Sequence, residues 1–163
     1  MRHFRLMSIF ALALVAALWA PASLARDPGA QAFLRSVYAP YEKAARWNDL
    51  SSEAKAARCF VPALTNLIAE ALADAKARNR VGRLDFDPFI GDQDWQATKI
   101  AVKVEPGASA DRATGTARFT LEGDREPSVV TLDLVKTPAG WRIAEIRWSW
   151  RKDSLVAALS KKD

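Results

Sequence analysis

Four aspartates within a single twelve-residue stretch are the densest group of chemically active side chains in the chain. They are Asp85, Asp87, Asp92 and Asp94, in LDFDPFIGDQDW at positions 84–95. A calcium loop of the EF-hand kind needs oxygen ligands at positions 1, 3 and 5, glycine at 6 and glutamate at 12. Counted from Asp85, positions 5, 6 and 12 hold Phe89, Ile90 and Gln96, so none of these three requirements is met. We therefore predict no metal site here, with an irregular cation site as the alternative.

The same stretch also has the composition of a structured connection. Asp87-Pro88 and Gly91-Asp92 are turn dipeptides. Five apolar side chains can hold the segment against a core: Leu84, Phe86, Phe89, Ile90 and Trp95. We favour this interpretation, in which Asp87, Pro88 and Asp94 shape a loop. The sequence leaves open whether Asp87 and Asp94 cap backbone amides or face a pocket.

Tryptophans and tyrosines form the second candidate group. In RWSWRK at 147–152, we expect Trp148 and Trp150 on one face of the last strand. Such a face can bind a sugar, a peptide or a lipid headgroup by stacking and cation–π contacts, although burial under helices is the favoured interpretation. We predict a small-ligand pocket at the end of the core, and its expected lining is Tyr38, Tyr41, Trp95 and Trp148.

The N-terminal segment has the pattern of a cleaved secretory signal. Arg2, His3 and Arg5 precede an apolar run at 9–20 that is too short for a membrane span, and 23–25 reads Ser-Leu-Ala. We predict a signal peptide at 1–25 and one domain at 26–163. The expected location is periplasmic or secreted, with no integral membrane span after cleavage.

Removal of that signal restricts the possible chemistry. The chain has one histidine, His3, and one cysteine, Cys59. The expected mature chain therefore lacks Ser-His-Asp and Cys-His catalysis and an ordinary zinc or copper site. An acid/base enzyme would need a tyrosine with an aspartate of raised pKa, and Asp133 is a candidate.

Charge gives no indication of a nucleic-acid partner. The whole chain has 24 basic and 19 acidic residues. Without Arg2 and Arg5 the basic residues number 22, which leaves a formal net charge of +3. We predict no nucleic-acid binding, because so small an excess creates little attraction for phosphates.

Hydrophobic periodicity divides the domain into a helical half and a strand half. We expect a helix from Pro28 that kinks or ends near Tyr38 because of Pro40. A short helix follows Ser52, and Pro62 opens a longer one. The period then changes to two, and the predicted strands cover 98–104, 113–121, 129–136 and 141–150. A last short helix, capped by Asp153, completes an α+β fold: N-terminal helices packed on a four-stranded antiparallel sheet.

Four motifs, in this order, resemble one known family. They are FLRSVYAPY at 33–41, CFVPALTNLI at 59–68, the aspartate-rich stretch, and LVKTPAGWRIAEIRW followed by SLVAAL, within 134–159. Together they resemble the bacterial exported family called domain of unknown function 3828. The resemblance implies a cone-like fold of the nuclear transport factor two-like, or cystatin-like, kind. One departure is Val61, where the family pattern has a hydroxyl residue before the helix-opening proline, so a weaker cap is expected.

The resemblance implies a fold and a compartment, but no activity. We predict an exported, non-catalytic binding module of unknown ligand, without a cofactor. Some related small exported domains resemble immunity proteins that neutralise cell-wall-degrading toxins. One alternative is therefore an immunity-like or assembly protein that binds an envelope protein partner through exposed arginines and loops. The other alternative is a histidine-free acid/base enzyme working in a cone-fold pocket.

Overall fold

The computed structural model describes residues 28–44, 49–93 and 96–161. The first half holds α1 (Pro28–Ala44), α2 (Glu53–Ala56) and α3 (Pro62–Arg78). The second half holds β1 (Ala97–Pro106), β2 (Arg112–Leu121), β3 (Ser128–Thr137), β4 (Gly140–Trp148) and α4 (Leu155–Ser160). No helix of the described residues is both long enough and apolar enough to cross a membrane.

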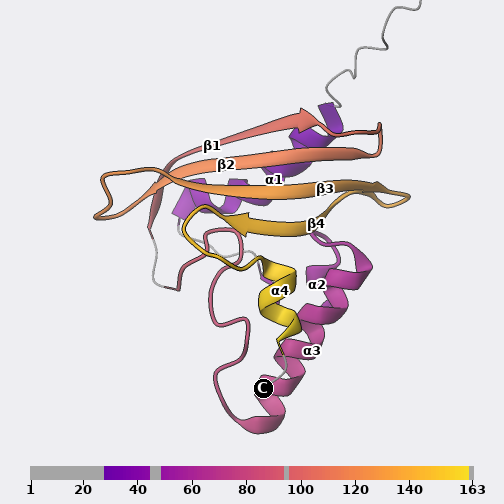
Figure 1. Ribbon diagram of the computed structural model, residues 1–163, viewed down its shortest axis with the longest axis vertical. Coiled ribbons are helices and arrows are strands. Elements are labelled where there is room, and N and C mark those ends of the chain that lie inside the picture. Colours follow the sequence, from indigo (N-terminus) through magenta and orange to yellow (C-terminus); the bar gives the residue numbers. More distant parts are fainter. Residues whose placement is uncertain (1–27, 45–48, 94–95, 162–163) are drawn as a thin grey trace, which may run out of the picture.

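The four strands form one antiparallel sheet in the order β1-β2-β3-β4. In Figure 1, α1 runs behind the sheet, while α2, α3 and α4 gather beyond its β4 edge. Short turns join the strands, and Gly123 and Gly140 adopt positive φ angles in two of them. The α+β prediction, with helices before a four-stranded sheet and a short helix after it, is confirmed.

The core lies between α1 and the sheet. Leu34, Val37, Tyr38 and Tyr41 are buried on one face of α1, as expected for an amphipathic helix packed on a sheet. Gly115 of β2 allows the close approach, because a Cβ there would lie 2.9 Å from Leu34 Cδ2. Burial of this face fixes the two tyrosines against the rest of the domain.

Of the two outcomes predicted for the first helix, a kink or an end near Tyr38, the end is wrong, because α1 continues through Pro40 to Ala44. A proline removes one helical hydrogen bond and crowds the preceding turn. Tyr41 lies beyond that proline and is only 3% exposed. Burial of the Tyr41 ring stabilises the helix beyond Pro40, so tertiary packing overrides the tendency of proline to end a helix.

The last strand is shorter than predicted, and its two tryptophans do not share one strand face. β4 ends at Trp148, where Arg151 N donates to Trp148 O at 3.3 Å and turns the chain. Trp148 is 3% exposed, whereas Trp150 is 43% exposed. The pattern at 147–152 thus contains one core tryptophan and one surface tryptophan.

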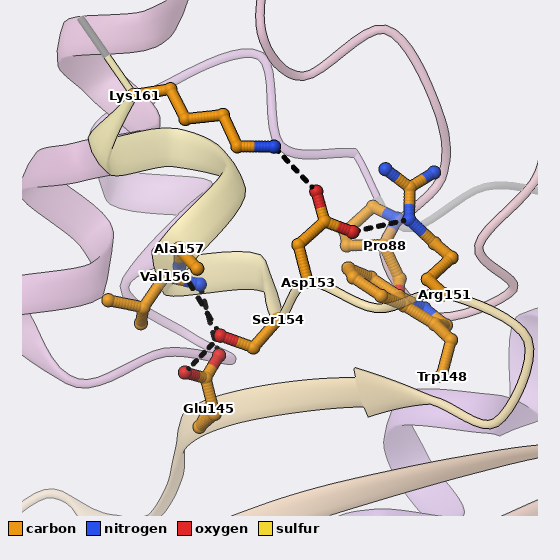
Figure 2. A network of polar contacts seen from close by, with 9 residues as sticks. All are labelled: Pro88, Glu145, Trp148, Arg151, Asp153, Ser154, Val156, Ala157 and Lys161. Atoms are coloured by element: carbon orange, nitrogen blue, oxygen red, sulfur yellow. Dashed lines mark hydrogen bonds and ion pairs between the residues drawn. The ribbon is translucent and has the colours of Figure 1, made fainter.

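The cap of the last helix also differs from the prediction by one residue. Ser154 is the N-cap of α4, and its Oγ accepts from Ala157 N at 3.3 Å. Glu145 on β4 accepts from Ser154 Oγ at 2.7 Å and from Val156 N at 3.0 Å (Figure 2). Asp153 instead forms ion pairs, described below. At α3, Val61 provides no side-chain cap, as its residue type predicts.

Candidate functional site

Residues 86–92 form a compact turn rather than an open acidic loop. Asp87 N donates to Asp92 O at 3.0 Å, and Gly91 N donates to Asp87 O at 2.6 Å. The Asp87 carboxylate accepts from Phe89 N at 2.8 Å, which is an Asx-turn. Asp87 therefore caps a backbone amide, as one of the two sequence-based alternatives proposed. Asp94 lies outside the described residues.

The Asp87 carboxylate is buried against a tyrosine of α1. Asp87 is only 2% exposed. Tyr41 Oη donates to the two oxygens of the Asp87 carboxylate, at 2.8 and 3.1 Å. Burial raises the pKa of Asp87 to about 6, although the Tyr41 hydroxyl and the amides of Phe89 and Ile90 counteract part of this effect. A carboxylate of this kind can change its charge near neutral pH.

Two other aromatic side chains bind the next residues of the turn. Trp148 Nε1 donates to Pro88 O at 2.9 Å, and Tyr38 Oη donates to Phe89 O at 3.0 Å. Burial, with the nearby charge of Asp87, raises the pKa of Tyr38 well above its usual range. Polar atoms of the core thus bind three consecutive residues of the turn.

Three of the four side chains predicted to line a pocket are therefore brought together. Tyr38, Tyr41 and Trp148 are each at most 3% exposed, and their polar atoms contact the turn. Trp95 lies outside the described residues. A ligand-binding role for these side chains stays a prediction. Their observed contacts give Asp87 and Pro88 the structural role expected of them.

The chain after β4 is fixed to the same turn. The Arg151 guanidinium lies 4.4 Å from the centre of the Phe86 ring and 5.1 Å from that of Trp148. Asp153 pairs with Arg151 at 3.2 Å and with Lys161 at 3.0 Å (Figure 2). These contacts hold residue 151 in place, and they position the intervening residues 149–150 at the surface.

Gly91 is the point where both tryptophans meet the turn. Its φ is +80°, and an added Cβ would lie 2.6 Å from Trp148 Cδ1 and 2.7 Å from Trp150 Cζ2. Only glycine combines this backbone conformation with such close contact. The Trp150 ring is therefore supported by backbone on one side while 43% of the residue stays exposed.

A surface hollow of about 550 Å³ lies beside Trp150. It is bounded by the outer end of the turn, the β2–β3 connection and the chain after β4. Its lining is Asp92, Leu121, Asp124, Arg125, Glu126, Pro127, Ser128, Ser149 and Trp150. The sequence indicated one residue of this lining, Trp150, as part of a possible stacking face with Trp148. It did not indicate the rest, because residues 123–127 have the composition of an ordinary turn.

A second hollow, of about 580 Å³, lies between α3 and the β3–β4 turn. Phe60, Pro62 and Pro138 make much of its lining apolar. Arg142 also lines it, but this side chain already donates to Ala57 O at 2.9 Å and to Trp141 O at 2.7 Å. The second hollow therefore presents fewer available polar groups than the first.

Asp133, the candidate base on the sheet, does not join the tyrosines. It forms a bidentate ion pair with Arg147, one contact being 2.9 Å, and its side chain is 44% exposed. Tyr41 is bonded instead to Asp87. Within the described parts of the chain, no group of three or more histidine, cysteine, aspartate or glutamate residues could hold a metal ion.

Comparisons with protein-family models, with curated proteins and with solved structures found no match for this chain. The resemblance to the domain of unknown function 3828 family, and the cone-like fold that it implies, therefore stay predictions.

Proposed function

We propose that this protein is an exported, non-catalytic binding module whose small ligand occupies the hollow beside Trp150. The observation that carries the proposal is an exposed tryptophan ring, held against Gly91, at the edge of a hollow with polar lining. Ligand sites are concave and have volumes of about 300–1,000 Å³; the hollow falls within this range of volume, and its lining is more polar than that of most such sites.

The buried aromatic residues support the proposal by holding the wall of the hollow in place. Tyr41 and Trp148 bond to the inner side of the turn, at Asp87 and Pro88. Asp92 lines the hollow from the outer end of the same turn. A wall held by packed side chains loses little entropy when a ligand binds, which favours binding on this side of the hollow.

The absence of histidine after residue 3 and the position of Asp87 favour binding over catalysis. Asp87 has a raised pKa of about 6, as a general base requires. However, Asp87 is only 2% exposed, and its carboxylate oxygens already accept hydrogen bonds from Tyr41 and Phe89. Acid/base catalysis here would require the turn to open, and an immunity-like role would require a protein partner. Both remain alternative hypotheses.

Export is proposed from the N-terminal sequence pattern. The basic residues, the apolar run at 9–20 and the small residues at 23–25 together are typical of a cleaved signal. In that setting the ligand would be a component of the bacterial envelope or its surroundings, in the periplasm or outside the cell.

A thermal-shift screen tests the proposed site. The probes are four chemical classes of small molecule: chitotriose, choline chloride, inorganic phosphate and trialanine. We expect at least one class to raise the melting temperature, because a ligand that binds only the folded state stabilises it. Trp150→Ala should reduce that increase, because it weakens binding. Trp141→Phe, a change at a tryptophan that does not line the hollow, should preserve it.

Three results would contradict the proposal. In the first, none of the four classes changes the melting temperature of the wild-type protein. In the second, Trp150→Ala keeps the full ligand-induced increase while its own fold is intact. An increase lost equally in both variants would indicate a general loss of structure and would also count against the site.

A further inference from the structure

We infer that the ligand at Trp150 is a neutral pyranose sugar whose apolar face stacks on the indole ring. This inference rests on the proposed function and names the chemical class that the hollow would bind. Three features of the hollow support it: the exposed Trp150 ring, the mixture of polar groups around that ring, and their formal charge.

The ring of Trp150 has the properties of a stacking platform. Its Cζ2 atom is packed against the backbone of Gly91, which limits movement of the indole. The chain on its C-terminal side is fixed by Arg151, which stacks over Phe86 and Trp148. A held but 43% exposed indole offers a flat apolar surface at small entropic cost.

The polar side chains of the hollow complement hydroxyl groups. Arg125, Ser128 and Ser149 can donate hydrogen bonds, and the carboxylates of Asp92, Asp124 and Glu126 can accept them. A sugar carries several hydroxyls, each able to donate and to accept. A lining that contains both kinds of group therefore suits a sugar better than it suits an apolar ligand.

The charged groups of the lining are not neutralised by one another. Among the ion pairs of the described residues, none includes Asp92, Asp124, Arg125 or Glu126. Three acids and one base give the lining an excess of negative charge. Such a lining disfavours phosphate and carboxylate ligands, because like charges repel, with water screening part of that repulsion at these exposed side chains. A cation is the main competitor to a neutral sugar.

An NMR titration tests the inference on the intact protein. Cellotriose and chitotriose are added while the indole N–H resonances are followed, with choline chloride and inorganic phosphate as competing probes. We expect a trisaccharide to shift the Trp150 resonance and to leave that of Trp141 unchanged. Trp150→Ala should weaken sugar binding about tenfold, because it removes the stacking surface.

A second variant separates sugar binding from cation binding. Asp124→Asn combined with Glu126→Gln keeps hydrogen-bond acceptors at both positions but removes two negative charges. A neutral sugar should bind this variant within about fivefold of the wild type, since uncharged acceptors still serve its hydroxyls. A cation should lose most of its attraction to the hollow.

The outcomes distinguish the chemical class of the ligand from the place where it binds. A trisaccharide shift retained in the amide variant supports the sugar class. A shift seen only with choline, and lost in the amide variant, overturns the sugar class but leaves the Trp150 hollow as the binding site. No shift of the Trp150 resonance with any probe overturns both.

One further measurement identifies the source of the sugar once binding is seen. Cosedimentation with purified insoluble peptidoglycan would support a polymeric cell-wall glycan as the ligand. Trisaccharide binding without cosedimentation would support a free saccharide. Either result keeps the sugar class.

Discussion

The replacement Asp87→Asn tests whether the carboxylate under the turn is as buried as the contacts indicate. Burial raises the pKa of Asp87 from an ordinary 3.8 to about 6 in the folded protein. That difference is equivalent to about 3 kcal/mol. A carboxyl group with a raised folded-state pKa adds stability below the unfolded pKa, and this stability is lost as the pH rises through the folded pKa. Ionisation of Asp87 therefore destabilises the fold above about pH 6.

Asparagine keeps an oxygen that can accept from the Phe89 amide and the Tyr41 hydroxyl, but it cannot ionise. The stability of the variant relative to the wild type should therefore increase by roughly 2–3 kcal/mol between about pH 4 and about pH 7. Urea unfolding followed by tryptophan fluorescence at several pH values measures this difference. Taking the difference between the two proteins removes the contribution of every other titrating group.

Tyr41→Phe supplies the matched control. It removes the hydroxyl that stabilises ionised Asp87, so the pKa of Asp87 should rise further and the pH dependence should become steeper. In the Asp87→Asn background the same change should leave the pH dependence unaltered. Parallel stability curves for wild type and Asp87→Asn from about pH 4 to about pH 7 would refute the reasoning.

Three further predictions concern the turn and the N-terminus. Gly91→Ala should lower stability by about 1–3 kcal/mol in chemical denaturation, because the new Cβ would meet Trp148 and Trp150 at under 3 Å; unchanged stability would refute the close packing. Trp148→Phe should cost about 1–3 kcal/mol by leaving the carbonyl of Pro88 without its donor, and a neutral effect would mean that water replaces the indole. Mass spectrometry of the exported protein should find Arg26 as the first residue, whereas a product that retains residues 1–25 would contradict cleavage.

The fold class could be predicted because local patterns carry it. The change of hydrophobic period from that of helices to that of strands separates the two halves. Proline and glycine mark the turns between the strands. The helix through Pro40 could not be predicted in this way, since its continuation depends on burial of Tyr41 against distant residues.

The site was only partly predictable, because its geometry depends on contacts far apart in the sequence. The sequence indicated a turn at Asp87-Pro88, but the burial of Asp87 depends on Tyr41, 46 residues away. Whether Trp150 faces the core or the solvent depends on the end of β4 and on the stacking of Arg151. No local pattern distinguishes the residues at 124–126 from those of any other exposed turn.

A crystal structure of the protein with bound cellotriose or chitotriose would test the central claim most directly. We predict a pyranose ring parallel to the Trp150 indole with carbon atoms about 3.5–4.0 Å apart, and hydroxyls bonded to Asp124, Arg125 or Glu126. Density for the sugar at any other surface, with the hollow beside Trp150 unoccupied, would contradict the account.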